Sequence, residues 1–347
     1  MSQRRLYLDA GVGESRGVVT LDGRPERLLI ARDGDAPVQA LGARVAARVR
    51  KVERAHAIAF LDLGEGPDAA LNLRPDSERL HEGQLVEVEV RAEARRGKGP
   101  VAHLVGPADG KPRLITAAPV LDEQLRAFAR NAEIIGDGPA RAVADAAQEE
   151  ALQSVFPLPG GGDVAIEATR ALTAVDVDLG GRPGGEAKRA ARSANLAALA
   201  MAARALRLKG QGGLVVIDLA GRGHDGPALL AAARAAFSPD NPGVAFGPIS
   251  RFGVLELTIP RRLRPLAEVL LDESGRPSAL TEALAVVRAL EREAAAHPGA
   301  RLEALVADDV AAAARPYLKA LEARFGARLA ITAEPDRARA DHAVRTR

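Results

Sequence analysis

Apolar and polar positions alternate with period two through the first third of the chain. Over residues 4–31 this alternation predicts two or three strands with turns at Gly11 and Gly23. A second alternating block covers residues 42–105, where Gly, Pro and Asp separate a series of short strands. About five short strands within roughly sixty residues are typical of a small β-barrel. The block at 42–105 is therefore predicted to be a barrel.

The middle of the chain mixes helical and strand patterns. After a predicted loop at GPADGKPRL, two helices are expected in DEQLRAFARNAEI and ARAVADAAQEEALQSVF. A hairpin is predicted over residues 163–178, with Glu167–Arg170 at its turn, and a long helix from Glu186 to about Lys209. The continuous apolar run LVVIDLAG predicts a short strand that is central and buried. A helix over Pro227–Phe237 and strands in GVAFGPI and FGVLELTIP complete this region.

The last part of the chain is set off by prolines. After Pro260–Pro265 the pattern predicts a helix at Leu280–Ala296, a strand, a helix at Asp308–Phe325 and a further strand. This succession is large enough to form a small α/β domain of its own.

Composition narrows the class of protein. With 47% apolar and 27% charged residues, the chain has a globular composition. No apolar run approaches the roughly eighteen residues of a membrane span, and no secretory signal is evident. The absence of cysteine excludes a disulfide framework and a thiolate metal site, so a reducing cytoplasm is expected. Basic residues are mostly Arg, which permits a nucleic-acid partner, although aromatics are only 3%.

Two apolar strands each carry an acid at or near the end, in ALTAVDVD and GLVVID. These acids are Asp176 and Asp218. An Asp at such a place is costly unless it is paired, and a helix cap or backbone amides can pair it as well as a cation can. Acids on neighbouring strands can share one ion, and Mg²⁺ prefers oxygen ligands. The histidines are scattered along the chain and form no cluster, so zinc is not the expected metal.

Around these acids the sequence resembles the ribonuclease E/G family. The resemblance rests on ATRALTAVDVDLGGRPGGEAKRAARSANLAALAMAARALRLKGQGGLVVIDLAG, preceded by LPGGGDVAIEAT and followed by PISRFGVLEL. These ordered blocks cover residues 156–257. The resemblance implies Asp176 and Asp218 as catalytic residues that bind Mg²⁺, with Mn²⁺ as a substitute. It implies endonucleolytic cleavage of single-stranded RNA that leaves 5′-phosphate and 3′-hydroxyl ends.

The resemblance also implies a fold of class α/β (α+β), in which an RNase H-like catalytic domain carries an inserted S1/OB-type β-barrel and is followed by a small C-terminal α/β domain. The expected boundaries are 1–38 for the first part of the RNase H-like domain, 39–106 for the S1/OB-like RNA-binding domain, 107–262 for the catalytic domain with a shortened 5′-sensor region at about 107–155, and 263–347 for the C-terminal domain.

Three further residues are expected to bind RNA. Phe60 in the barrel matches a family aromatic that contacts bases, and a place in the barrel core is the equal alternative. Lys98 in RRGKGP matches a basic RNA contact, against the alternative of a solvated loop. Arg251 lies in the matching block PISRFGVLEL.

The sequence departs from the family at several places. Asp178 replaces an Asn two residues after the first acid and is a candidate third metal ligand, while Gly221 stands where a second acid follows the other strand. Leu63 and Ala70 replace aromatics expected on the barrel surface. No match to the 5′-sensing pocket is found, so 5′-end sensing is expected to be absent or rebuilt. The Cys-Pro-x-Cys zinc link is missing, so oligomers could form only by another route.

Two other functions compete with an endoribonuclease. A non-catalytic RNA-binding protein on the same scaffold is credible because of these losses, although such a protein has no need for paired acids. An unrelated α/β phosphate-binding enzyme would use the glycine-rich loops Gly160–Gly162 and Gly180–Gly185, neither of which fits a phosphate-binding motif.

Overall fold

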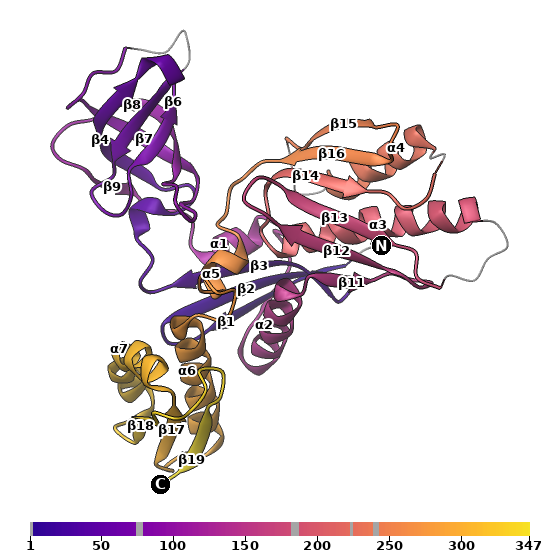
Figure 1. Cartoon of the computed structure of the whole chain (residues 1–347). Helices are drawn as coiled ribbons and strands as arrows, with labels where there is room; N and C mark the ends of the chain where they lie inside the picture. The colour runs from indigo at the N-terminus through magenta and orange to yellow at the C-terminus, as the bar shows by residue number, and fades with distance from the viewer. Residues whose placement is uncertain (1–2, 74–78, 182–186, 223–224, 239–242) are drawn as a thin grey trace.

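The computed structural model describes residues 3–73, 79–181, 187–222, 225–238 and 243–347. Within these ranges the strands form four sheets, with helices packed on three of them (Figure 1). One of the four closes into a barrel. The expected mixed α/β class with a β-barrel is therefore confirmed.

The first sheet is built by the N-terminal strands. It has the order β10-β1-β2-β3, and its members are β1 (Arg4–Ala10), β2 (Glu14–Leu21), β3 (Arg24–Arg32) and β10 (Ile134–Ile135). Helices α1 (Leu121–Arg126) and α2 (Asp137–Leu152) pack against it. The first of the two predicted helices, at residues 122–134, is thus much shorter than expected: it ends at Arg126, and its last predicted residue, Ile134, pairs with Leu6 of β1 instead.

The barrel follows in the chain. Its five strands close through pairing of the first with the second: β4 (Arg44–Glu53), β5 (Ile58–Asp62), β6 (Ala69–Asn72), β7 (Leu85–Ala92) and β8 (Val101–Pro107). Short 3₁₀ turns lie at Pro37–Gln39 and Arg54–His56. The stretch predicted as a loop contains a further strand, β9 (Arg113–Thr116), which pairs with β4.

A six-stranded sheet carries the two acids. Its order is β11-β12-β13-β14-β16-β15, and its strands are β11 (Val155–Pro157), β12 (Asp163–Ala168), β13 (Thr173–Asp178), β14 (Gly213–Asp218), β15 (Ala245–Ile249) and β16 (Val254–Ile259). Helices α3 (Ala187–Leu208) and α4 (Gly226–Phe237) bury one face of this sheet in an apolar core (Figure 1). The hairpin, both helices and the strand pair near 250 agree with the sequence predictions, except that the turn of the hairpin lies at residues 169–172, two residues later than predicted.

The other face of this sheet is open. On β14, Val215 and Ile217 are buried, whereas Leu214 is 40% exposed and Asp218 is exposed. The strand is central in the sheet, as predicted, but it is buried on one face only. Helices cover only one face of the strand. The apolar run is nevertheless continuous, because Leu214 and Val216 are apolar residues on the open face.

The N-terminal strands and the acid-bearing strands belong to separate sheets. The expected RNase H-like unit would join residues 1–38 to the strands of Asp176 and Asp218. Instead, β1–β3 pair with one another and with β10, and none of the described ladders links them to β11–β16. The segment 107–155 forms no sheet of its own in the described chain, because β9 joins the barrel and β10 joins β1.

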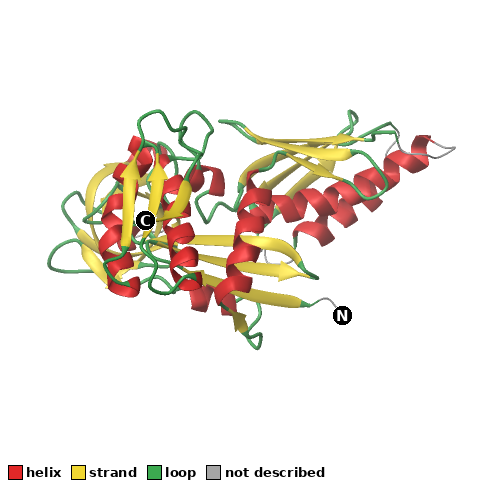
Figure 2. Ribbon diagram, turned by 90° about the horizontal axis from the view of Figure 1, so that it is seen from below, coloured by secondary structure: helices red, strands yellow, loops and turns green. Residues whose placement is uncertain are grey.

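The C-terminal part contains α5 (Leu266–Leu270), α6 (Ala279–Ala296), β17 (Leu302–Val306), α7 (Asp308–Phe325), β18 (Leu329–Ala333) and β19 (Ala343–Thr346). Its sheet has the order β18-β17-β19, with α6 and α7 beside it (Figure 2). The helices and the first two strands follow the prediction, while β19 and α5 were missed.

Buried ion pairs fasten this part to the first sheet. Glu14 on β2 accepts hydrogen bonds from Arg32, at 2.8 Å, and from Arg288 on α6, at 2.6 Å. Glu291, also on α6, accepts from Arg141 on α2 at 3.0 Å. Buried charges persist only when they are paired in this way.

Among the helices that the structure describes, none has the length and apolar character that a membrane span requires.

Candidate functional site

Asp176 and Asp218 lie directly side by side. They are register partners in the parallel pairing of β13 with β14, at the carboxyl end of each strand. Adjacent strands are about 4.8 Å apart, and partners in register point to the same face. Both side chains are exposed on the open face of the sheet. The fold therefore brings the two predicted acids together.

Asp178 shares that face but has another partner. It follows Asp176 by two residues, and both are exposed while Val175 and Val177 are buried, as the alternation of a strand requires. Its carboxylate Oδ1 accepts a hydrogen bond from the backbone N–H of Gly180. This contact closes the turn after β13. Asp178 thus serves the local backbone, whatever it adds to the site.

The two-acid arrangement fits a hard divalent cation. In the residues that the structure describes, no group of three or more His, Cys, Asp or Glu side chains is gathered as a metal cluster. Mg²⁺ does not need one, because it usually keeps several waters and binds proteins through one or two carboxylates. Asp176 and Asp218, exposed and in register, supply such a pair.

Asn195 fixes the loop that follows Asp218. This residue is fully buried on α3, and its amide makes two hydrogen bonds with the backbone of Ala220. Its Nδ2 donates to the carbonyl of Ala220 at 3.0 Å, and its Oδ1 accepts from the N–H of Ala220 at 2.9 Å. Asn195 belongs to the run SANLAALA inside the family-like block, but the sequence gave it no role. The structure makes it a positioning residue for the end of β14.

The backbone conformation at Gly221, in the loop after β14, explains why no acid stands at this position. Its backbone has φ +87°, and a Cβ built there would lie 2.8 Å from the Cβ of Ala191. A side chain would need both a strained backbone and a displaced helix. The path of this loop therefore leaves no room for a second acid at Gly221.

The turn between β15 and β16 lies against the same strand end. Val254 is the register partner of Asp218, and the carbonyl of Gly253 accepts a hydrogen bond from the N–H of Leu219 at 3.1 Å. Arg251 is exposed in this turn, and its guanidinium carbon lies 4.7 Å from the ring centroid of Phe252. The turn that carries the predicted RNA contact Arg251 therefore adjoins the end of β14, where Asp218 lies.

Phe60 lies on the outer side of the barrel. On β5, Ala59 and Leu61 are buried in the barrel core, whereas Phe60 is half-buried between them in the alternation. Its register partners are Lys51 on β4 and Ala70 on β6. This placement answers the alternative of a core position, since the ring is outside the apolar core of the barrel.

Leu63 and Ala70 were both predicted to replace aromatics on the barrel surface, but only one of them lies on that surface. Leu63 is 1% exposed and belongs to the barrel core, so its description as a lost surface aromatic was wrong. Ala70 does lie outside, next to Phe60. A single aromatic, rather than two, is therefore missing from this outer surface.

Lys98 is exposed at a basic groove. Arg95, Arg96 and Lys98 of the loop before β8 line the groove together with Arg264 and Glu268, and its volume is about 420 Å³. Burial, and secondarily the nearby Arg95, lower the pKa of Arg261 in the adjoining segment. Positive charge is thus concentrated where the barrel meets the chain leaving β16.

The predicted residues form two separate groups. The first group lies at the carboxyl ends of β13 and β14 and in the adjoining turn, and it contains Asp176, Asp178, Asp218 and Arg251. The second group, Phe60 and Lys98, belongs to the barrel. The barrel and the acid-bearing sheet stand apart in Figure 1. RNA contacts on the barrel would therefore act at a distance from the acid pair.

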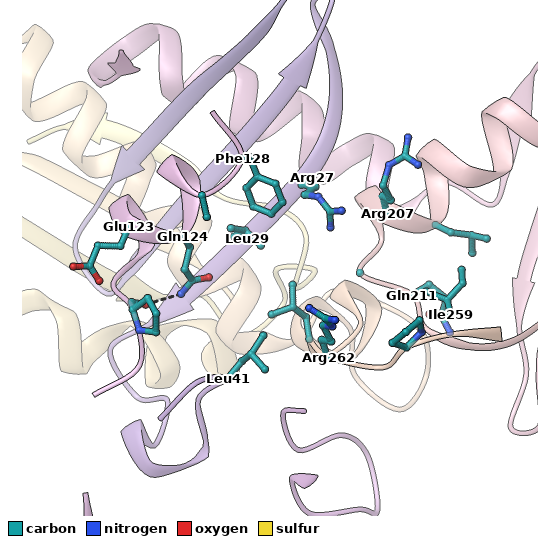
Figure 3. Close-up of a pocket in the computed structure, with 16 residues that line it drawn as sticks. Arg27, Leu29, Leu41, Glu123, Gln124, Phe128, Arg207, Gln211, Ile259 and Arg262 are labelled. Carbon is teal, nitrogen blue, oxygen red and sulfur yellow. Dashed lines mark hydrogen bonds between the residues drawn. The ribbon is translucent and has the colours of Figure 1, made fainter. Parts of the chain in front are cut away.

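A cavity of about 330 Å³ lies at the junction of β3, α1, the end of α3 and the segment after β16 (Figure 3). Arg27 stacks on Phe128 at 4.7 Å from the ring centroid, and Arg207 is paired with Glu26 at 2.6 Å. The walls are largely apolar. None of the predicted site residues lines this cavity.

Comparison with known proteins points in the same direction. Residues 134–262 match the model of the Ribonuclease E/G family. The chain is 37% identical over 123 residues to Ribonuclease E of Haemophilus influenzae, covering 35% of this chain and 13% of that protein. It is 37% identical over 123 residues to Ribonuclease E of Escherichia coli, covering 35% and 12%.

A plant protein is also similar. The chain is 32% identical over 148 residues to the chloroplastic Ribonuclease E/G-like protein of Arabidopsis thaliana, covering 41% of this chain and 14% of that protein. The aligned part of the chain thus spans 12% to 14% of the length of these three relatives. The family match contains both Asp176 and Asp218.

Proposed function

The chain belongs to the ribonuclease E/G family, and from this premise we propose that it is a Mg²⁺-dependent endoribonuclease that cleaves single-stranded RNA. The observation that carries the proposal is the register pairing of Asp176 with Asp218 on an open sheet face, inside the region that matches the family. An endoribonuclease acting in this way would leave 5′-phosphate and 3′-hydroxyl ends.

Asp176 and Asp218 are the metal ligands in this proposal, with Mn²⁺ as a substitute for Mg²⁺. A cation held there supplies Lewis-acid polarisation of a phosphodiester oxygen and a water of lowered pKa. Two exposed carboxylates so close together repel each other and would repel a phosphate. A cation held by the two carboxylates would remove both penalties, so the acids would fit a phosphodiester substrate when it is bound.

The remaining residues of the site position groups around this pair. Asn195 holds the backbone after Asp218 through Ala220, so the end of the strand that carries the second carboxylate is fixed. Arg251 places a permanent positive charge next to the pair, suited to a phosphate of the bound strand. Preorganised charge of this kind is usually the largest contribution to catalysis of such reactions.

The barrel is proposed as the second RNA contact, of the S1/OB type. Phe60 offers a ring on its outer surface beside Lys51, and Lys98 belongs to a basic groove. Stacking on an aromatic with a basic neighbour binds single strands without sequence preference. The same proposal places the protein in a reducing cytoplasm, gives it a role in RNA processing, and holds that 5′-end sensing is absent or rebuilt.

The decisive experiment is cleavage of an end-labelled single-stranded RNA with Mg²⁺. Wild-type protein is expected to cut it, EDTA to stop the reaction, and Asp176→Asn and Asp218→Asn each to reduce the rate by on the order of a hundredfold or more. Glu167→Gln, which removes an exposed acid elsewhere on the same hairpin, is the matched control and should cut normally.

A second readout separates metal binding from turnover. Calorimetric titration with Mn²⁺ should show binding to wild type and to Glu167→Gln, and loss of binding in both aspartate variants. Equal cleavage by all four proteins would disprove the metal assignment. RNA binding without any cleavage would instead favour the alternative, an inactive RNA-binding protein on this scaffold.

A further inference from the structure

Phe252 is unusual among the aromatic residues of this chain. The chain has seven phenylalanines and no tryptophan. All seven lie in the described ranges, and six are buried or half-buried. Phe252 is 75% exposed, the most exposed of the large apolar side chains. A ring left in water forgoes the free energy that burial would give, so its position needs a reason.

The backbone holds this ring in a defined turn. The N–H of Gly253 donates to the carbonyl of Ser250 at 3.0 Å, and the N–H of Ser250 donates to the carbonyl of Val254 at 2.9 Å. The hydroxyl of Ser250 also accepts from the N–H of Phe252 at 3.2 Å. These bonds close a tight connection between β15 and β16, and they leave Phe252 at its tip. The ring is therefore displayed by an ordered turn.

The tip of this turn adjoins the acid pair. Val254 is the register partner of Asp218, and Phe252 precedes Val254 by two residues, or at most about 7 Å of chain. The bond from Leu219 to Gly253 ties the turn to the end of β14. Phe252 thus lies in the turn that leads into β16, and Asp218 ends β14, the neighbour of β16 in the sheet (Figure 1).

Arg251 completes the arrangement. Its guanidinium lies over the Phe252 ring at 4.7 Å from the centroid, a cation–π geometry that restricts the ring and keeps a positive charge beside it. An aromatic face next to a guanidinium is the combination that binds an unpaired base together with its phosphate. A base within a duplex is already stacked on both faces and cannot use such a ring.

We propose that Phe252, braced by Arg251, is a base-stacking platform for the nucleotide next to the scissile phosphate, and that it selects single-stranded RNA at the acid pair. This inference rests on the proposed endoribonuclease function. It assigns a specificity-determining role to a residue on the catalytic sheet itself, independent of the barrel.

The test uses protein in which Asp176→Asn and Asp218→Asn prevent turnover, and single-stranded RNAs that carry one 2-aminopurine at successive positions. Stacking should quench fluorescence at a particular position when Phe252 is present. Phe252→Ala and Phe252→Leu should abolish the quench and weaken RNA binding by on the order of tenfold, whereas Phe252→Tyr should retain both. Val120→Ala, which trims another exposed side chain (63% exposed), is the matched control.

In the otherwise wild-type protein, Phe252→Ala should raise KM for single-stranded RNA more than it lowers kcat. Unchanged quenching, affinity and KM in Phe252→Ala would overturn the inference while leaving the endoribonuclease proposal intact. A Phe252-dependent quench in a protein that never cleaves RNA would support the platform and refute the function. If Phe252→Ala instead changes the sedimentation coefficient and not RNA binding, the ring serves a protein contact and the inference falls.

Discussion

The side-chain amide of Asn195 pairs with both the N–H and the C=O of Ala220, so a buried residue on α3 fixes the chain two residues beyond Asp218. Asn195→Ala would leave both groups of Ala220 without this partner, at a cost of about 2 kcal/mol in the free energy of unfolding. Because the loop after Asp218 would loosen, kcat should fall as well. Urea unfolding and RNA cleavage measure the two effects.

Asn195→Asp provides the matched control for that prediction. The carboxylate can still accept from the N–H of Ala220, but it cannot donate to the carbonyl. Because Asn195 is fully buried, an unpaired carboxylate that faces the carbonyl oxygen of Ala220 adds a further cost, so stability and kcat should fall at least as far as in Asn195→Ala. Loss of stability without any loss of kcat would show that Asn195 only holds the fold.

Asp178 should tolerate the change to Asn. Its Oδ1 accepts from the N–H of Gly180, and an Asn side chain offers an acceptor of the same shape. We expect Asp178→Asn to retain Mn²⁺ binding and cleavage, and Asp178→Ala to lose about 1 kcal/mol of stability with the turn contact. Titration with Mn²⁺ is the measurement. If Asp178→Asn lost as much Mn²⁺ affinity as Asp176→Asn, Asp178 would be a metal ligand as well.

Phe60 should contribute to RNA affinity and not to the chemical step. Its ring lies outside the barrel core beside Lys51, in a part of the fold that stands apart from the acid pair. Phe60→Ala should weaken binding of single-stranded RNA by on the order of tenfold, with kcat unchanged at saturating RNA. Phe60→Tyr should bind normally. A fall in kcat with no change in affinity would contradict the separation of the two groups.

The C-terminal sheet should lose stability in acid through Glu303. This carboxylate on β17 is 2% exposed as a side chain, and it accepts from Thr332 at 2.6 Å and from Arg345 and Arg347 on either oxygen. Hydrogen bonds from Thr332, then from Arg347 and Arg345, lower its pKa from 4.5 to about 2. The lowered pKa means that the folded state favours the charged carboxylate.

That stabilisation is complete above the unfolded pKa of 4.5 and disappears as the pH falls toward about 2. Wild type should therefore lose more stability than Glu303→Gln between pH 6 and pH 3, measured by thermal unfolding of the C-terminal helices. Glu273→Gln, at an exposed carboxyl, should follow wild type. Parallel pH curves for wild type and Glu303→Gln would refute the assignment.

The amino-acid sequence by itself predicted most of the local elements and singled out Asp176 and Asp218 as the candidate acid pair. Period-two alternation fixed the barrel strands and the hairpin that carries Asp176, because burial of one face of a strand forces that pattern. The ordered blocks around Asp176 and Asp218 determined the family. Even the shared face of Asp176 and Asp178 followed from alternation alone.

Only the tertiary structure decided which elements share a sheet and which faces stay open. Alternation cannot distinguish a strand that joins one sheet from a strand that joins another, so the separation of β1–β3 from β11–β16 was not predicted. The open face of β14, the clamp of Asn195 on Ala220 and the place of Phe252 beside Asp218 depend on contacts between distant segments. Such contacts arise from packing and hydrogen bonding across the fold, which no local pattern of residues records.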